Sequence, residues 1–371
     1  MMIAILLAAF GAAPPSRAEP APIPEEAITP YLTPQRVAQI DAGRTINLVC
    51  LGQGSPTIIL SAGSGGSSFD WRFIQPTLAK RTRTCAWDRA GHGFSSPSPE
   101  PQDTVHTTQD LEQALKKADI QGPYVMVSHS LGVYESLRFT DRHRQSVVGL
   151  VLVDPDIPDR AAVDERLAPQ FAALSRALED QDVKRRQDCA TEIRAGTAKS
   201  GTPRFEKCTV PFVPDSFPTL KAAIARLNAD PARLLTQASL ENEHYNSSRQ
   251  ITDPRRRYGD MPIVVLTAGR DEESVMGAIA RLPPGTPGAA TPAELVQLHE
   301  QISRFIREGW NAAHEGYAAL SSRGRHQMVP DSTHDIAGHE PEVVITAIME
   351  VLNMSQVHPA ARVPFAQPST P

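Results

Sequence analysis

Residues 124–132, YVMVSHSLG, decide the fold of this 371-residue chain, because an apolar stretch ends there in two serines, a histidine and a glycine. The apolar part predicts a buried strand, and residues 131–143 that follow have a helical pattern. A strand, a small-x-Ser-x-Gly turn and a helix in succession are typical of the tight turn that holds a nucleophilic serine above a sheet. The stretch therefore predicts an α/β fold and a reactive serine.

Ser130 is the serine that fits this turn. The strained backbone requires small residues two positions before and two positions after the nucleophile. Ser130 has Ser128 before it and Gly132 after it, whereas Ser128 has Met126 before it. A second interpretation stays open here: Ser130 only caps the following helix, since serine is a favoured N-cap residue.

Strands and helices alternate along the rest of the chain. Most apolar runs are continuous, as strands covered on both faces require. The predicted strands are residues 46–52, 57–63, 82–88, 124–128, 148–154, 262–269 and 325–330, and the predicted helices are residues 71–80, 108–118, 131–143 and 340–352. This order predicts a mostly parallel central sheet with helices on both faces.

Two long intervals interrupt the alternation. The first, from Pro155 to Met261, is polar, helical and punctuated by proline, and we expect it to be an inserted helical cap. The second, residues 270–324, contains RLPPGTPGAATP, which resists regular structure, and then a helix through Trp310 and His314. The expected division is an export signal (1–18), a linker or first segment (19–44), the two halves of the core (45–155 and 262–354), the cap (156–261) and a disordered tail (355–371).

The N-terminus predicts export. The apolar run from Met1 to Ala13 is too short to span a bilayer, and Ser16-Arg17-Ala18 fits a small-x-small cleavage site. A disordered apolar tail is the alternative, because no Lys or Arg precedes the run. No other apolar run approaches membrane-spanning length. We expect a secreted or periplasmic protein without an integral membrane segment.

The four cysteines fit an oxidising compartment. Cys50 and Cys85 lie in predicted strands of one sheet, and Cys189 and Cys208 flank one polar segment. We therefore favour the pairs Cys50–Cys85 and Cys189–Cys208 over four buried thiols. Because no CxxC or HExxH spacing occurs, no metal site is predicted.

Composition excludes some partners. The formal net charge is −5 with both signs interspersed, so the chain has no basic stripe to neutralise phosphates. We expect no nucleic-acid partner. Hydrophobic residues make up 40% of the chain, which is enough for a sizeable core.

A serine hydroxyl needs a base, and His334 is best placed to be that base. It lies between the last predicted strand, which ends near Pro330, and the helix that begins near Glu340. His326 falls within the strand and His314 within the preceding helix. The loop after the last strand is where such a base is needed.

Backbone N–H groups for an oxyanion are expected from Leu131, directly after the nucleophile, and from Ser64 in the glycine-rich stretch SAGSGGSS at residues 61–68. The same stretch supports a rival interpretation. Gly63-x-Gly65 follows a strand, and another strand ends at Asp88, as in a dinucleotide-binding fold. That interpretation leaves Ser130 and His334 without a role.

Taken together, IILSAGSGGSSFDW (58–71), CAWDRAGHGFSSP (85–97), GPYVMVSHSLGVYESLRF (122–139), GLVLVDP (149–155) and DSTHDIAGHEPEVVITAI (331–348) resemble the α/β-hydrolase fold. The likeness is to the branch of small-molecule esterases and lipases, and it leaves the cap unmatched. It implies an acyl-enzyme route without metal or organic cofactor. The acid of the triad is then expected after the strand at residues 262–269, which favours Asp271, with Glu272 beside it and Asp154 as the alternative.

The expected function is a serine hydrolase acting on an ester, with an amide or lactone next. Ser130 is the nucleophile, His334 the base, Asp271 the acid, and Ser64 and Leu131 the oxyanion donors. A binding protein that kept the fold without turnover is the rival from another class, since fold does not imply function.

Overall fold

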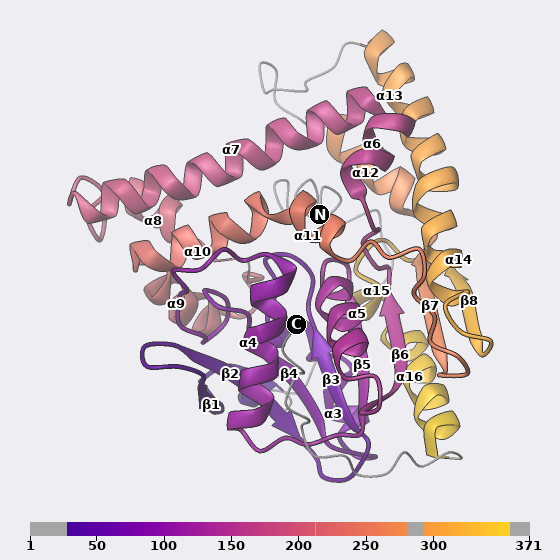
Figure 1. Cartoon of the computed structure of the whole chain (residues 1–371). Helices are drawn as coiled ribbons and strands as arrows, with labels where there is room; N and C mark the ends of the chain where they lie inside the picture. Colours follow the sequence, from indigo (N-terminus) through magenta and orange to yellow (C-terminus); the bar gives the residue numbers. More distant parts are fainter. Residues whose placement is uncertain (1–27, 212, 281–291, 357–371) are drawn as a thin grey trace.

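A computed structural model describes residues 28–211, 213–280 and 292–356 and contains one eight-stranded sheet (Figure 1). The strand order is β1-β2-β4-β3-β5-β6-β7-β8. Strand β2 runs antiparallel to both of its neighbours, and the remaining pairs are parallel. The strands are β1 Arg36–Gln39, β2 Thr45–Leu51, β3 Thr57–Ser61, β4 Thr84–Trp87, β5 Tyr124–His129, β6 Val147–Val153, β7 Ile263–Ala268 and β8 Gly324–Val329.

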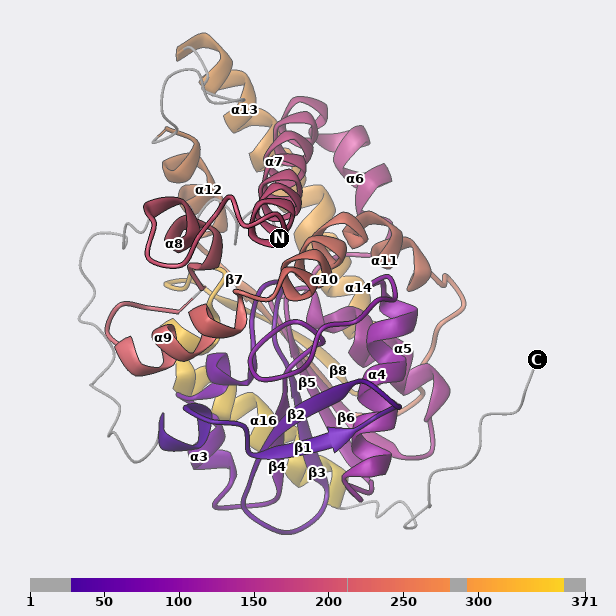
Figure 2. The ribbon, with the colours of Figure 1, turned by 90° about the vertical axis from the view of Figure 1, so that its left-hand side faces the viewer.

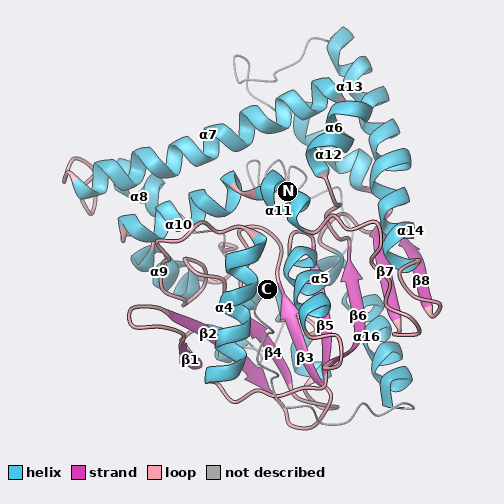
Figure 3. Cartoon of the chain, viewed as in Figure 1, coloured by secondary structure: helices cyan, strands magenta, loops and turns pink. Residues whose placement is uncertain are grey.

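Helices cover both faces of the sheet, as Figure 3 shows by colour. The helices are η1 Thr29–Tyr31, η2 Ser68–Trp71, α3 Gln75–Leu78, α4 Thr104–Lys117, α5 Gly132–Arg142, α6 Arg160–Leu167, α7 Pro169–Arg194, α8 Pro203–Thr209, α9 Pro218–Leu227, α10 Pro231–Asn242, α11 His244–Gln250, α12 Asp271–Ala280, α13 Pro292–Arg304, η3 Phe305–Asn311, α14 Ala312–Ala318, α15 Ile336–His339 and α16 Pro341–Gln356.

Successive strand residues enter two different cores. Met126 packs with α4, α5 and α14 on one face, whereas Val125 and Val127 pack with α3 and α16 on the other. Neighbouring side chains of a strand point to opposite faces, so a strand covered on both sides must be apolar throughout. This is the physical reason for the continuous apolar runs, and the predicted fold class is confirmed.

The insertion between β6 and β7 forms helices α6 to α11. Figures 1 and 2 show α7 and α10 lying across one end of the sheet, above the loops that follow the parallel strands. Ile157, Phe171, Phe305 and Trp310 share an apolar cluster, so the helices of the second insertion pack against those of the first. A helical insertion is therefore present, and it faces the carboxyl ends of the strands, where ligands of open α/β sheets bind.

Both predicted disulfides are formed. Cys50 and Cys85 are register partners on the antiparallel strands β2 and β4. Cys189 and Cys208 join α7 to α8 within the cap.

Strand β1 was not predicted, because its sequence RVAQ contains no apolar run. It is an edge strand with one buried residue, Ala38. Edge position explains the polar composition, since one side of the strand has no partner. Residues 1–27, which include the expected signal, lie outside the described residues, as do residues 281–291 and 357–371. The expected tail, residues 355–371, is wrong at its start, because Ser355 and Gln356 belong to α16.

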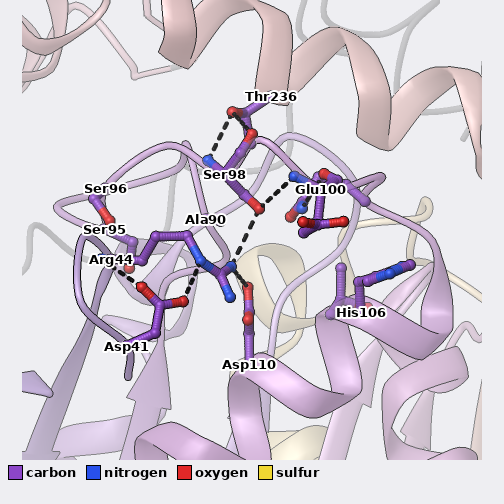
Figure 4. Close-up of polar contacts among 12 residues, drawn as sticks. Asp41, Arg44, Ala90, Ser95, Ser96, Ser98, Glu100, His106, Asp110 and Thr236 are labelled. Carbon is purple, nitrogen blue, oxygen red and sulfur yellow. Dashed lines mark hydrogen bonds and ion pairs between the residues drawn. The ribbon is translucent and has the colours of Figure 1, made fainter. Parts of the chain in front are cut away.

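A chain of polar contacts connects the first hairpin to the cap (Figure 4). Arg44 donates to Asp110 of α4 at 2.9 Å and to the Ser98 hydroxyl at 3.1 Å. The Ser98 N–H donates to Thr236 Oγ1 at 3.0 Å, and Thr236 lies on α10. These side-chain contacts therefore attach the cap helix α10 to the core, in addition to the covalent backbone.

Candidate active site

Ser130 occupies the sharp turn between β5 and α5. Its φ is +52°, a left-handed value that is strained for a residue with a side chain. A Cβ at Gly132 would lie 2.5 Å from the Ser61 carbonyl oxygen, so only glycine lets α5 approach β3 this closely. The Ser130 hydroxyl is buried without a hydrogen-bond partner among the described residues, and no side chain caps α5. The serine is therefore not a helix cap.

His334 and Asp154 form a hydrogen-bonded pair. His334 Nδ1 lies 2.5 Å from Asp154 Oδ2, and both side chains are buried. Asp154 Oδ1 accepts from the Ala268 N–H at 3.0 Å and from Trp310 Nε1 at 3.2 Å. Burial favours a higher pKa for Asp154, but the bond and charge of His334 outweigh it and hold the pKa below its usual value. An ionised Asp154 thus orients the imidazole.

The expectation that Asp271 hydrogen-bonds His334 is corrected by this geometry. Asp154 follows β6 and has φ +41°, which turns its carboxylate toward the loop that holds His334. Asp271 begins α12 and lies near the pair: one atom each of Asp154, Asp271 and His334 fall within 4.8 Å of one another. Glu272 points elsewhere, bonding Ser303 and, at 2.8 Å, His299.

Asp271 is a second buried carboxyl with no hydrogen bond of good geometry to the described residues. Burial, and then the charge of Asp154, raises the pKa of Asp271 well above its usual range. Two carboxylates this close cannot both ionise at low cost. The negative charge of the pair is therefore favoured on Asp154, and the proton is favoured on Asp271. The same three residues have the donor types of a metal site, but His334 Nδ1 is already used by Asp154.

His129, the residue before the nucleophile, positions the loop of His334. Its Nε2 donates to the His334 carbonyl oxygen at 2.9 Å, and the two rings lie 4.6 Å apart between centroids. Burial and the proximity of His334 lower the pKa of His129 to about 4, so His129 is neutral. His334 Nε2 is buried without a partner among the described residues, as is the hydroxyl of Ser130. The described residues show no hydrogen bond between these two groups, and the contact through His129 ties the loop of His334 to the residue before Ser130.

The predicted oxyanion loop lies against the nucleophile. A Cβ at Gly63 would lie 3.2 Å from the Ser130 Cβ, which places the following residue, Ser64, beside the turn. Arg89 holds this loop: its guanidinium donates to the carbonyl oxygens of Ala62 at 2.7 Å and Gly63 at 3.0 Å. Arg89 therefore holds the loop that carries Ser64 beside the nucleophile.

Asp88 does not have the surroundings of a ribose-binding carboxylate. It is fully buried and accepts from the backbone N–H groups of Ser68 and Phe94 and from the Asn47 side chain, all within 2.9 Å. Its Oδ1 holds the start of η2, and its Oδ2 holds the loop after β4. The geometry therefore gives no support to the dinucleotide interpretation.

Sequence reasoning missed His129, Trp310, Arg89 and Glu135. Only His129 carried a signal, since it adjoins the nucleophile in the sequence. The others come from elements distant in the chain, and their contacts exist only after folding.

Comparisons with known proteins identify the family of the chain. Residues 58–347 match the model of the "Alpha/beta hydrolase family". "Uncharacterized protein YqjL" of Bacillus subtilis (strain 168) is 32% identical over 304 residues, which cover 81% of this chain and 85% of that protein. "Putative carbamate hydrolase RutD" of Klebsiella pneumoniae (strain 342) is 30% identical over 102 residues, covering 27% of this chain and 38% of that protein.

Solved structures share the fold at low identity. A thermophilic esterase from Thermogutta terrifontis has a TM-score of 0.52 at 18% identity, covering 87% of this chain and 99% of its own. An epoxide hydrolase from Bacillus megaterium has a TM-score of 0.55 at 14% identity, covering 86% and 100%. The chain belongs to the alpha/beta hydrolase family, and the activity that this membership supports is that of a hydrolase.

Proposed function

We propose that the protein is a serine hydrolase that cleaves a carboxylic ester of a small molecule through a Ser130-His334-Asp154 triad. The observation that carries the proposal is the 2.5 Å hydrogen bond between His334 Nδ1 and Asp154 Oδ2. It leaves Nε2 as the free basic nitrogen of the imidazole, which a serine hydroxyl requires.

In the proposed reaction, Ser130 Oγ attacks the ester carbonyl carbon and its proton passes to His334 Nε2. The negative charge on the carbonyl oxygen is bound by the N–H groups of Ser64 and Leu131. Asp154 stabilises the imidazolium that forms. The imidazolium then protonates the leaving alcohol, and a water molecule, deprotonated by the same nitrogen, releases the acid and restores the serine.

An ester is the expected substrate, with an amide or lactone next. Two of the relatives support acyl chemistry by their names: one structural neighbour is an esterase, and one sequence relative is a putative carbamate hydrolase. A serine at the turn forms a covalent acyl intermediate with any of these carbonyl groups. No cofactor is part of this route.

The protein is also proposed to be exported. The two disulfides are compatible with an oxidising compartment. In the described ranges, no helix is both long enough and apolar enough to cross a membrane. The expected signal at residues 1–18 is the remaining support.

Labelling with a fluorophosphonate tests the proposal. We expect stoichiometric modification of Ser130, found by peptide mass spectrometry, and none in Ser130→Ala. Ser128→Ala is the matched control and should still be labelled. Hydrolysis of a phenyl ester should disappear in Ser130→Ala and persist in Ser128→Ala. A protein that binds ligands without turnover would resist the reagent, and that result would reject the enzyme assignment.

A further inference from the structure

A cavity of about 440 Å³ lies between the oxyanion loop and the cap. Ser64 and Gly65 line it from the loop, and Gln237 and Glu241 line it from α10. Apolar and aromatic side chains, among them Phe69 and Leu220, also line it, so the wall combines polar groups with apolar surface. Ser64, which lines the cavity, also supplies the proposed oxyanion N–H, so the cavity extends from the oxyanion loop toward the cap.

Glu241 is the unusual group in this cavity. The residue is 7% exposed, and its Oε1 accepts a hydrogen bond from the Ser64 hydroxyl at 2.7 Å. Its Oε2 is buried without a partner among the described residues. A buried carboxyl oxygen without a hydrogen bond is costly, so such an atom in a cavity indicates a site for a ligand group.

The position of Glu241 is fixed before any ligand arrives. Helix α10 is bound to the core through Thr236, whose hydroxyl lies 3.0 Å from both the N–H and the carbonyl oxygen of Ser98 (Figure 4). Gln237, on the same helix, donates to the Gly91 carbonyl oxygen of the core at 2.8 Å. A preorganised carboxyl binds its partner without a further ordering cost.

The charges around the cavity select the kind of partner. Arg185 and Arg186 line it and share one carboxylate, Asp182. Arg233 also lines it and donates to the carbonyl oxygens of Ser95 and Gly93. These three guanidinium groups disfavour an ammonium ion in the same space.

Burial raises the pKa of Glu241, and Arg186 opposes that effect. A hydroxyl can donate to the carboxylate and can accept from the protonated acid. It therefore fits the site in either form, whereas an ammonium group fits only the ionised form.

We propose that this cavity is a substrate subsite in which Glu241 hydrogen-bonds a neutral hydroxyl, so that the substrate is a hydroxylated ester and not a plain hydrocarbon ester. The inference rests on the proposed function. Because Ser64 touches both the oxyanion and Glu241, the hydroxyl lies only a few bonds from the ester carbonyl.

Two isosteric pairs of esters test the subsite from either side of the scissile bond. The alcohol-side pair is 2-hydroxyethyl benzoate and propyl benzoate, and the acyl-side pair is phenyl 3-hydroxypropanoate and phenyl butanoate. We expect kcat/KM to favour the hydroxylated member of at least one pair by about tenfold or more, as expected when an analogue leaves a polar site unpaired. Equal values in both pairs would overturn the proposal. A third ester, 2-aminoethyl benzoate at pH 6, should gain nothing over propyl benzoate.

The ratio of kcat/KM for the two esters of a pair distinguishes loss of hydroxyl recognition from a general loss of activity. Glu241→Ala should bring it to within about twofold of unity, whatever its effect on overall rate. Ser64→Ala breaks the bond to Glu241 but keeps the carboxyl, and should retain the preference. Glu243→Ala, in the same stretch of chain but not lining the cavity, is the matched control and should also retain it. A preference that survives in Glu241→Ala would reject the assigned residue.

Calorimetric titration of Ser130→Ala with the same esters makes the test independent of turnover. A lower Kd for a hydroxylated member supports the subsite even if no ester is hydrolysed. If the wild type is neither labelled by the fluorophosphonate nor active on the esters, that result rejects only the proposed reaction. Equal Kd values, or no binding by any of the four esters, would reject the subsite.

Discussion

Arg89 and Glu135 form a salt bridge whose side chains are 3% and 1% exposed, and it joins the two halves of the candidate oxyanion hole. Arg89 Nε and Nη2 reach Glu135 on α5 at 2.6 and 2.9 Å, while the same guanidinium holds the carbonyls of Ala62 and Gly63. Helix α5 follows Leu131, and the loop carries Ser64. One side chain therefore fixes the spacing between both proposed oxyanion donors.

Breaking this pair should affect stability and activity separately. Arg89→Met alone leaves a buried charge on Glu135 and should cost about 3–5 kcal/mol of unfolding free energy. The double variant Arg89→Met, Glu135→Leu removes both charges and should recover much of that loss. Its kcat should still fall about 10²-fold, since the loop is no longer held toward the oxyanion.

Urea unfolding and ester kinetics measure the two effects. Arg142→Met with Glu112→Leu is the matched control, because that Arg–Glu pair is more exposed and should contribute about 1 kcal/mol or less. A double variant with wild-type kcat would show that the Arg89–Glu135 pair only stabilises the fold.

Replacing each acid by its amide should identify the one that orients His334. Asp154→Asn cannot hold the required tautomer and should lower kcat by about 10⁴. Asp271→Asn replaces a neutral acid by a neutral amide and should stay within about tenfold of the wild type. Steady-state kinetics on one phenyl ester, with circular dichroism to verify folding, makes the comparison. The reverse order of losses would return the role to Asp271.

The contribution of Asp271 to the stability of the wild type should fall with rising pH. Its pKa is raised by burial and by Asp154, whereas in the unfolded chain the group ionises near pH 4. The folded state binds more protons between these two values, so the free energy of unfolding decreases as pH rises through that window. Asp271→Asn should therefore be more stable than the wild type at pH 8, and the difference should shrink toward pH 4.

Urea unfolding at several pH values checks this prediction. Asp260→Asn, at an exposed position, is the control and should give a curve parallel to that of the wild type. A constant difference between wild type and Asp271→Asn would contradict the raised pKa.

The Cys189–Cys208 disulfide should stabilise the cap. The two cysteines are 19 residues apart, and closing a loop of that length contributes about 3 kcal/mol in the chain-entropy model. Replacing both by serine should lower the Tm measured by calorimetry. If the cap shapes the substrate site, KM should rise more than kcat falls. An unchanged Tm would mean that the α7–α8 packing holds without the bond.

Export predicts a mature N-terminus near Glu19 and no free thiol in protein recovered from outside the cytoplasm. Intact-mass measurement after alkylation without reduction tests both. Retention of Met1, or four alkylated cysteines, would contradict the prediction.

The sequence alone determined the layers of the fold and two members of the candidate triad. Continuous apolar runs predicted strands buried on both faces, because every side chain of such a strand enters a core. Ser130 and His334 were identifiable because their signals are local: small residues around a tight turn, and a histidine between a strand and a helix. The cysteine pairs followed from their positions on neighbouring strands and around one segment.

Only the tertiary structure decided which carboxylate hydrogen-bonds His334. Asp154 and Asp271 both follow strands whose carboxyl ends meet at the same edge of the sheet, so both approach His334. The family resemblance favoured Asp271, and no local feature of the sequence indicated the bond to Asp154. The choice depends on which oxygen receives the N–H groups of Ala268 and Trp310, and Trp310 is 156 residues from Asp154. The unpaired carboxyl oxygen of Glu241 is likewise a property of packing, because whether a buried group finds a partner depends on residues that the chain brings together only when it folds.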